Sequence, residues 1–509
     1  MKKLSENHKS KFSLKNLLKP GQSLKERTVK GGFWLFSFQI INRLFGFIRT
    51  IILARLLSPN DFGLFGIALV TLDLIEIFSR TGFKQALIQK KTDIKSYLDT
   101  AWTAGIIRGV LIATILFFVS PHVSTFFKEP AAEPIVKIIG FAFILQPLAN
   151  IAVLYFEKEL EFHKYFVYQF IGTIANVAVA ITAALILRSI WALVFGLIAE
   201  NFAKCITSYI IDPYRPKLRL DLQKVKELYL FGRWILGSGI LFFLLTQGDD
   251  ILVGKILGAV ALGFYQMAYR ISCLPATEYS RLITRVTFPA YSKLQDNLDK
   301  LNAAYSRVFL LTTIFSFPTS GFIFILSPEF TRLFLGDQWM PIVPVMQILA
   351  LYGLIRAIGG TTQPVFAAIG RPDITTKLQS GQLILMAILI YPLTYYWGIV
   401  GSAVAVTISV LVFHSVSVYL VIKTIQSAYK KISISILLPL LSTLVMILSI
   451  YVVKTYVFKN IGFLAFFLLG GIGIVAYVFI AILFDKYSHS GCKQIVQDQL
   501  SVLFQKYNK

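Results

Sequence analysis

Long apolar segments follow one another through most of this 509-residue chain, and they limit the folds that it can adopt. Each segment extends over about 20 residues or more, the length that an α-helix needs to cross a bilayer. The segments are continuous and lack the alternation of apolar and polar residues that barrel strands show. Hydrophobic residues make up 56% of the chain and charged residues 15%, unlike an ordinary soluble domain. The sequence therefore predicts an all-α polytopic membrane protein.

We expect about fourteen transmembrane helices. The expected spans are 30–56, 62–84, 99–124, 134–156, 165–187, 190–211, 229–257, 262–286, 303–326, 341–369, 377–397, 399–423, 434–457 and 461–484. The polar segment 1–28 lacks the apolar core and the cleavage site of a signal peptide, so we expect a tail there.

Positive charge is distributed unevenly between the two ends of the expected spans. The chain has 50 Lys and Arg against 26 Asp and Glu, a formal net charge of +24. Most of the Lys and Arg fall in the two tails and in the loops on one side. The positive-inside rule places this side, with both termini, in the cytoplasm. Topology accounts for most of the excess charge, so no nucleic-acid partner is expected.

An internal repeat organises the chain. A shift of about 200 residues places Trp34 on Trp234 and Gly63 on Gly263, and a similar shift places "VSPHVSTFF" on "LSPEFTRLF". The repeating unit contains six spans, an even number, so both copies enter the membrane from the same side. The sequence thus predicts two six-helix bundles related by a parallel repeat, with two extra helices and a substrate site between the halves.

The repeat divides the chain into expected parts. These are a basic cytoplasmic N-terminal tail (1–28), an N-terminal six-helix bundle (29–211), a cytoplasmic linker (212–228), a C-terminal six-helix bundle (229–424), extra helices 13 and 14 (425–484) and a cytoplasmic C-terminal tail (485–509).

Polar side chains recur at helical spacing on the first expected span. Gln39, Asn42, Arg43 and Arg49 share one face, opposite Phe, Leu and Ile. A charge at the centre of a membrane helix costs roughly 2.5–3.5 kcal/mol, so this face is expected to line the protein interior or a water-filled path.

Further cations lie inside later spans and give the interior a surplus of positive charge. Because Arg binds phosphate in a bidentate way, this surplus indicates an anionic substrate. We expect Arg43, with Asn42 beside it, and Arg270 to contact a diphosphate. The complete set expected in a central cavity is Gln39, Asn42, Arg43, Arg108, Arg270 and Arg356.

Carboxylates on the second span are candidates for ion coupling. Asp73 and Glu76 lie on one face of that span, and a desolvated intramembrane acid suits proton exchange. The alternative is a structural ion pair with Arg43 or with Arg80.

The repeat also suggests an outer gate. An offset of 200 places Arg49 on Asp249, with Asp250 next to it. Equivalent positions of a parallel repeat have similar depth, so opposite charges there can meet when the halves converge. The alternative is local pairing of the two aspartates, for example with Lys255.

Ordinary catalytic and metal-binding patterns are not found in the sequence. Its three Cys and five His show no paired or ligand spacing, so we expect no disulfide, no metal and no cofactor. The short outer loops offer few acid–base groups, so an enzyme is not expected.

The stretch "FWLFSFQIINRLFGFIRTIILARLLSPNDFGLFGIALVTL" resembles the opening of polysaccharide exporters of the multidrug/oligosaccharidyl-lipid/polysaccharide (MOP) superfamily. Within it, the chain is similar to bacterial Wzx-type lipopolysaccharide and exopolysaccharide flippases. This resemblance implies a multi-pass protein of the bacterial cytoplasmic (inner) membrane. It also implies alternating access that moves an undecaprenyl-diphosphate-linked oligosaccharide from the inner to the outer leaflet for surface polysaccharide synthesis.

Other functions stay open at this point. They are a drug or cation antiporter or a MurJ-type lipid II flippase of the same superfamily, a membrane polysaccharide polymerase or ligase, and a structural membrane protein. Beside the lipid-linked substrate, the expected partners are membrane lipids, H⁺ or Na⁺, and other polysaccharide assembly proteins.

Overall fold

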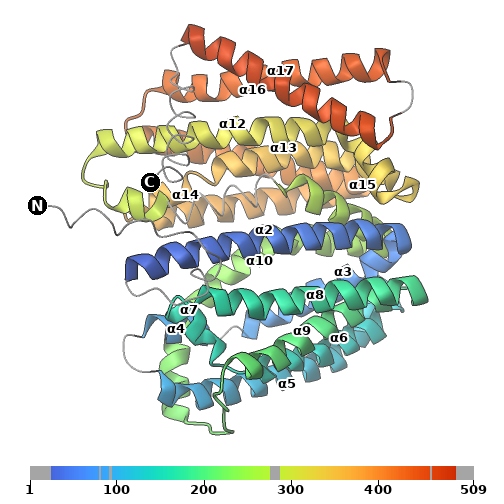
Figure 1. Cartoon of the computed structure of the whole chain (residues 1–509), viewed down its shortest axis with the longest axis vertical. Coiled ribbons are helices and arrows are strands. Elements are labelled where there is room, and N and C mark those ends of the chain that lie inside the picture. Colours follow the sequence, from blue (N-terminus) through green and yellow to red (C-terminus); the bar gives the residue numbers. More distant parts are fainter. Residues whose placement is uncertain (1–23, 80–81, 91–93, 275–286, 459–460, 489–509) are drawn as a thin grey trace, which may run out of the picture. The chain divides into compact units, whose positions relative to one another are not determined.

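Helices form the described part of the chain (Figure 1). A computed structural model describes residues 24–79, 82–90, 94–274, 287–458 and 461–488. Within these ranges there are helices and no strands, as the sequence predicts. The chain divides into two compact units, Met1–Ile240 (unit 1) and Leu241–Lys509 (unit 2).

Unit 1 is built from long helices joined by short turns. Figure 1 shows α2 beside α8, and the same region packs α5 on α6 and α8 on α9. Small residues of α8 and α9, such as Ala180 and Ala192, let the end of α2 approach closely around Leu53 and Leu57. Its helices are α2 (Leu24–Leu56), α3 (Pro59–Ser79), α4 (Phe83–Gln89), α5 (Lys95–Phe127), α6 (Ala132–Leu148), α7 (Val153–Lys158), α8 (Phe162–Leu187), α9 (Trp191–Ile211) and the start of α10 (Leu222–Ser272).

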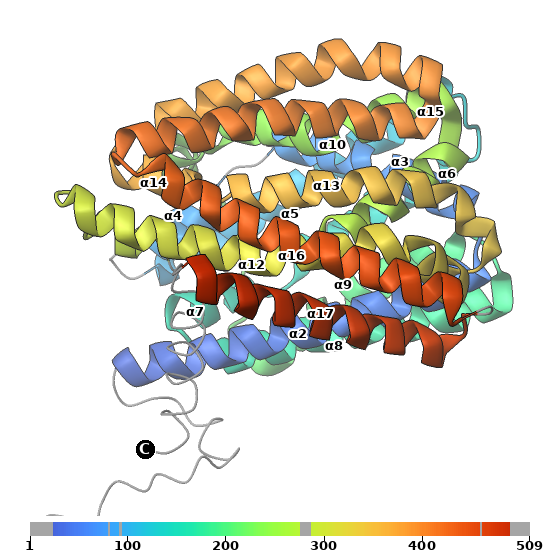
Figure 2. The same cartoon turned by 90° about the horizontal axis from the view of Figure 1, so that it is seen from above.

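Unit 2 continues α10 and adds a second set of helices. The last two helices, α16 and α17, pack on α12 through Leu326, Met446 and Leu469, and Figure 2 shows the three helices side by side. These are the expected extra helices. The elements of unit 2 are α12 (Leu298–Phe330), a π-helical turn η1 (Thr331–Leu335), a 3₁₀ turn η2 (Asp337–Ile342), α13 (Val343–Gly359), α14 (Gln363–Ala368), α15 (Pro372–Thr424), α16 (Tyr429–Tyr456) and α17 (Phe463–Ser488).

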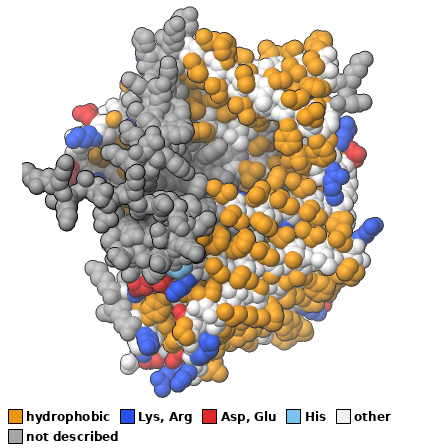
Figure 3. All heavy atoms as spheres, viewed as in Figure 1, with side chains coloured by type: hydrophobic (Ala, Val, Ile, Leu, Met, Phe, Trp, Pro, Cys, Tyr) orange, Lys and Arg blue, Asp and Glu red, His pale blue; other side chains and the backbone are white. Residues whose placement is uncertain are grey.

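The helices have the length and composition of membrane spans. Within the described residues, ten helices are long and apolar enough to cross a bilayer. Figure 3 shows apolar side chains over the helix surfaces, with charged side chains gathered toward the left and right edges. An apolar surface along the helices suits contact with the hydrocarbon core of a bilayer. The chain is a multi-pass membrane protein.

Two of the ten helices contain a sharp break. Gly258 (φ 84°, ψ −178°) interrupts α10, and Gly398 (φ 58°, ψ −141°) interrupts α15. These backbone angles are available to glycine and not to residues with a Cβ, so glycine is required at both joints. Each break lies where two expected spans meet, while the exact number of fourteen membrane crossings stays a prediction.

The order and length of the helices repeat along the chain. The helices α5 and α12 each have 33 residues, α6 and α13 each have 17, and α7 and α14 each have 6. The turn at Ser58 between α2 and α3 corresponds to the break at Gly258, an offset of 200. This correspondence supports the internal duplication. It also shows that the fourth span of each repeat is broken, where the sequence suggested one continuous helix.

The sequence "SPND" forms the joint before α3. The Ser58 hydroxyl donates to Asp61 Oδ2 at 2.6 Å, and the Asp61 amide donates back to Ser58 Oγ at 3.3 Å. This is a capping arrangement at the first turn of a helix. The other carboxylate oxygen of Asp61 accepts a 2.9 Å bond from the Ile190 amide at the start of α9. Asp61 therefore fixes the beginnings of two helices.

The segment 212–221 is extended and packs on unit 1. Tyr214 donates to Asp99 Oδ1 at 2.6 Å, and the Lys217 amide donates to the same oxygen at 2.9 Å. Farther along, Lys90 Nζ lies 2.6 Å from Glu227 Oε1, and the Tyr97 hydroxyl donates to Glu227 Oε2 at 2.9 Å. We call this Lys90–Tyr97–Glu227 group the linker clasp. The expected linker 212–228 is thus attached to unit 1 along its length.

Candidate functional site

A chain of polar contacts connects three helices of unit 1. Arg49 of α2 donates a hydrogen bond to Asn176 Oδ1 of α8, and Asn176 Nδ2 donates to Glu200 Oε2 of α9 at 2.7 Å. Lys204 completes the chain, with Nζ 2.6 Å from Glu200 Oε1. The guanidinium of Arg49 is thereby connected to a carboxylate through one amide, which reduces the cost of holding both charges among helices.

A second residue of the polar stripe on α2, Asn42, also contacts α8. Asn42 Oδ1 accepts a 2.7 Å bond from the Thr173 hydroxyl of α8. Gln39 and Arg43 are half-buried on α2. The polar face predicted on the first span therefore packs, in part, against α8 inside unit 1.

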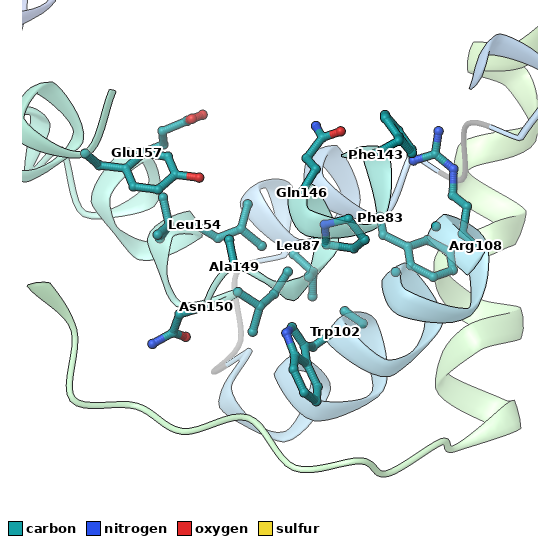
Figure 4. A pocket seen from close by; sticks show the side chains of 18 of the residues that line it. Phe83, Leu87, Trp102, Arg108, Phe143, Gln146, Ala149, Asn150, Leu154 and Glu157 are labelled. Atoms are coloured by element: carbon teal, nitrogen blue, oxygen red, sulfur yellow. The ribbon is translucent and has the colours of Figure 1, made fainter. Parts of the chain in front are cut away.

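Glu76 and Arg108 both line a cavity in unit 1, and Figure 4 shows Arg108 at one end of it. Arg108 Nη2 lies 3.7 Å from Glu76 Oε1. Arg108 also donates to Ser79 Oγ at 3.2 Å and to the Glu76 carbonyl at 3.3 Å. The structure thus brings together a residue expected to bind substrate and one expected to couple ions. Asp73 is half-buried on α3, one turn before Glu76, and Arg80 lies outside the described residues.

Unit 2 contains an acidic pair, of which Asp249 is buried and Asp250 is half-buried. Asp249 is only 3% exposed and accepts a 2.8 Å hydrogen bond from Tyr265, while Asp250 accepts one of 2.8 Å from Gln266 Nε2. Both donors lie beyond the Gly258 break, so these bonds connect the two halves of α10. Hydrogen bonds of this kind lower the cost of burying a carboxylate.

Arg356 is held by two tyrosines in unit 2. Its Nη1 donates to Tyr269 at 2.8 Å and to Tyr352 at 3.3 Å, and the two hydroxyls lie 2.9 Å apart. The guanidinium also lies 5.8 Å from the centre of the Tyr352 ring, a cation–π distance. Arg270 is exposed on α10, in the half that follows Gly258. The contacts with Tyr269 and Tyr352 hold Arg356 inside the fold of unit 2.

The two sides of the expected gate each have a local contact. Arg49 binds Asn176 within unit 1, and Asp249 and Asp250 bind Tyr265 and Gln266 within unit 2. The aspartates thus bind Tyr265 and Gln266, whereas Lys255 was the local partner considered above. The gate itself stays a prediction.

Sequence reasoning missed several partners. Asn176 is 127 positions from Arg49, and no local pattern connects the two residues. Tyr265 and Gln266 were also missed, although a weak signal exists. They lie 16 positions after Asp249 and Asp250, with a glycine between, which suits a helix that turns back on itself.

Metal-binding clusters do not occur in the part of the chain that the structure describes. Cys205 is half-buried and Cys273 is buried, and neither forms a disulfide, while Cys492 lies outside the described residues.

Two repeated helical units with apolar surfaces and internal charge clusters define a polytopic membrane protein of the transporter class. Two solved structures share this fold. The lipid II flippase MurJ, in an inward closed conformation, has a TM-score of 0.73 at 15% identity, covering 89% of this chain and 99% of that one. An inward-facing multidrug resistance MATE transporter of the MOP superfamily has a TM-score of 0.57 at 15% identity, covering 76% and 96%.

Residues 52–344 match the family described as polysaccharide biosynthesis protein, and the chain belongs to that family. The lipopolysaccharide biosynthesis protein WzxC of Escherichia coli is 27% identical, over 82% of this chain and 85% of its own length. The teichuronic acid biosynthesis protein TuaB of Bacillus subtilis is 26% identical, over 61% and 65%. The succinoglycan biosynthesis transport protein ExoT of Rhizobium meliloti is 24% identical, over 64% and 66%. The resemblance to MOP polysaccharide exporters is confirmed.

Proposed function

We propose that this protein is a flippase that moves an undecaprenyl-diphosphate-linked oligosaccharide across the bacterial cytoplasmic membrane. The carrying observation is the family match over residues 52–344, together with a multi-pass transporter fold. Relatives named for lipopolysaccharide and teichuronic acid synthesis, and one named as a succinoglycan transport protein, support a transporter of surface polysaccharide rather than an enzyme. The distribution of Lys and Arg supports a cytoplasmic position of both termini.

The transport cycle follows from a repeated fold with internal charge. In the proposed cycle, the protein alternately opens a substrate site to the cytoplasm and to the outer face, and substrate binding shifts the population between these states. Arg43 and Arg270 are proposed to contact the diphosphate, with Asn42 beside Arg43. Half-burial of Arg43 on α2 and exposure of Arg270 on α10 leave these guanidinium groups within reach of a ligand.

The direct test is reconstitution of the full-length protein in vesicles with an undecaprenyl-diphosphate-linked oligosaccharide. Translocation is measured as the fraction of glycan that a membrane-impermeant reagent can oxidise at the opposite leaflet. Parallel vesicles contain lipid II or receive a multidrug-transporter substrate. Faster movement of the oligosaccharide alone supports the proposal, and selective movement of lipid II or of the drug contradicts it.

Variants test the diphosphate contact. Arg43→Ala and Arg270→Ala are expected to slow translocation, because each removes a bidentate phosphate ligand. Lysine at either position is expected to keep part of the rate, since the charge remains while the planar fork is lost. Unchanged rates in both alanine variants, at equal protein levels, contradict this assignment.

A further inference from the structure

Unit 1 contains a cavity of about 620 Å³ where α6 ends and α7 begins. Its walls come from α3, α4, α5, α6, α7 and α8, all within unit 1. Ligand sites have volumes of roughly 300–1,000 Å³, so this cavity has the size of a small-molecule site. In Figure 4, Glu157 and Arg108 lie at opposite ends of the labelled side chains, with Trp102, Leu87 and Gln146 between them.

Polar side chains line the middle of the cavity beside aromatic rings. The buried indole Nε1 of Trp102 has no hydrogen-bond partner in the described part of the chain. The Gln146 side chain is exposed to the cavity, on the wall opposite Trp102 (Figure 4). Phe143 and Tyr168 add ring surface to the same walls. A group that presents both hydroxyls and an apolar face complements such walls, and a pyranose ring is a group of this kind.

The charge of the cavity argues against binding of the substrate's diphosphate there. Among the described residues that line it, the charged groups are the carboxylates of Glu76 and Glu157 and the guanidinium of Arg108, a formal sum of −1. Arg108 is moreover compensated by Glu76 at 3.7 Å. A diphosphate placed here would meet more negative than positive charge, which costs free energy in a partly dehydrated site. The cavity therefore suits the uncharged part of a substrate.

A smaller recess extends the same wall. It has a volume of about 110 Å³ and shares Gln146, Tyr168 and Gln169 with the larger cavity. Its cation, Lys204, is paired with Glu200 at 2.6 Å, so the recess adds amides without adding net charge. Asn150, in contrast, is used by the fold, because its amide donates to the Tyr214 carbonyl at 2.7 Å.

We propose that the cavity between Trp102, Gln146 and Glu157 is a saccharide subsite that holds a sugar ring of the oligosaccharide, apart from the arginines that contact its diphosphate. The proposal rests on the flippase function proposed above. The cavity lies beside α4, α7 and the charged segment 157–164, on the side that we expect in the cytoplasm from the overall distribution of Lys and Arg. The subsite is thus on the loading side of the transporter.

An organic cation is the competing ligand, since aromatic rings and a carboxylate also bind cations. The test uses the full-length protein in lipid nanodiscs and saturation-transfer NMR. The probes are the methyl glycosides of glucose, galactose and N-acetylglucosamine, with tetraphenylphosphonium as the cationic probe. At least one glycoside is expected to receive saturation.

Gln146→Leu removes an amide at similar size, and Trp102→Phe removes the indole N–H while keeping a smaller aromatic ring. Each is expected to weaken glycoside binding by about fivefold, the effect of one hydrogen bond of about 1 kcal/mol. The matched controls are Gln347→Leu on α13 and Trp191→Phe on α9, which lie outside the cavity lining and should leave binding unchanged. Gln146→Asn, which keeps the amide, serves if the leucine variant loses its thermal transition.

Two results would overturn the subsite: glycoside signals that are equal in the cavity variants and the controls, or a variant-sensitive signal from tetraphenylphosphonium alone. Vesicle translocation separates this failure from failure of the proposed function. If the wild type moves the lipid-linked oligosaccharide and the cavity variants bind glycosides normally, the function stands and the subsite is wrong. If glycoside binding depends on the cavity while the wild type moves no lipid-linked oligosaccharide, the subsite stands and the function is wrong.

Discussion

Asn176 donates a 2.7 Å hydrogen bond to the carboxylate of Glu200, and its carbonyl oxygen accepts one from Arg49. One amide thus separates a cation on α2 from an anion on α9. An amide suits this position because its NH₂ group can donate to a carboxylate while its oxygen accepts from a guanidinium. The arrangement connects α2, α8 and α9 through the Asn176 amide, which stands between Arg49 and Glu200.

Replacement of this amide is expected to destabilise unit 1. Asn176→Leu removes two hydrogen bonds to charged groups, each worth roughly 1.5–3 kcal/mol. We expect a lower melting temperature of the purified protein, measured by the exposure of Cys205 to a thiol-reactive dye. Asn201→Leu on α9 is the control, because its amide donates to a backbone carbonyl, that of Leu197. Equal melting temperatures of the two variants would show that the hydrogen bonds of Asn176 with Arg49 and Glu200 contribute little to stability.

Asp61 is expected to matter for folding rather than for transport chemistry. Asp61→Ala removes the carboxylate that accepts hydrogen bonds from the Ser58 hydroxyl and from the Ile190 amide. Loss of a helix cap costs about 0.5–2 kcal/mol, and here two helix starts are affected. The expected result is a lower melting temperature with normal translocation per folded molecule. Asn60→Ala, one position earlier, is the control, and a loss of transport at unchanged stability would contradict the prediction.

The outer gate predicts rescue by charge reversal. Arg49→Asp and Asp249→Arg are each expected to reduce export, and the double variant is expected to recover it if the two side chains meet during the cycle. The local bonds to Asn176 and Tyr265 must then break when the gate closes. Export is measured in cells as surface polysaccharide at matched protein levels. Equal loss in all three variants would favour purely local roles.

Glu76 is the stronger candidate for ion coupling, because it lies 3.7 Å from Arg108 at the cavity edge. If protonation of Glu76 drives transport, Glu76→Gln should move substrate at a rate that no longer depends on an imposed pH gradient. Glu133→Gln, whose carboxylate pairs with Lys137 at 2.6 Å on α6, is the matched control. A wild-type rate that ignores both pH and Na⁺ gradients would leave the Glu76–Arg108 pair with a structural role.

The linker clasp should depend on pH. The hydrogen bonds from Lys90 and Tyr97 lower the pKa of Glu227, and the hydrogen bond with Glu227 is the main cause that raises the pKa of Lys90. The contribution of Glu227 is present above its unfolded pKa of about 4.3 and is lost as the pH falls through the lower folded value. The contribution of Lys90 is present below about pH 10.4 and is lost as the pH rises through the higher folded value.

Hydrogen exchange of residues 212–221, corrected for intrinsic rates, measures the clasp. We expect strong protection near neutral pH and a loss of protection below about pH 4. Glu227→Gln should lower the protection at neutral pH, whereas Glu161→Gln, which removes the partner of Lys164, should not. Identical protection in Glu227→Gln and wild type would mean that the Asp99 contacts alone hold the segment.

Sequence patterns predicted the parts of the fold that depend on local composition. Apolar length identified the spans, and the internal repeat was predicted from an offset of about 200 residues, the offset that also separates the turn at Ser58 from the break at Gly258. Polar spacing predicted the stripe on α2. The breaks between α6 and α7 and between α13 and α14 were missed, because apolar residues continue on both sides of them.

Side-chain partners were harder to predict than helices. The 2.6 Å pair of Glu200 and Lys204 has a spacing of four residues on one helix, which is the kind of contact that a local pattern can indicate. The partner of Arg49 was not predicted, because helix packing decides which distant residue faces it. The tyrosines around Arg356 were missed for the same reason, since Tyr269 is 87 positions away.

The joint between the last two helices of each repeat has two solutions in this chain. Unit 1 places Arg188 in the ordinary left-handed region (φ 45°, ψ 45°), which many residues enter at a cost of about 1–2 kcal/mol. Unit 2 places Gly398 at φ 58° and ψ −141°, where a Cβ is not accommodated. After duplication, the two copies therefore inherited unequal freedom to mutate. Position 188 can drift among residue types over evolutionary time, while position 398 is held at glycine by the backbone itself.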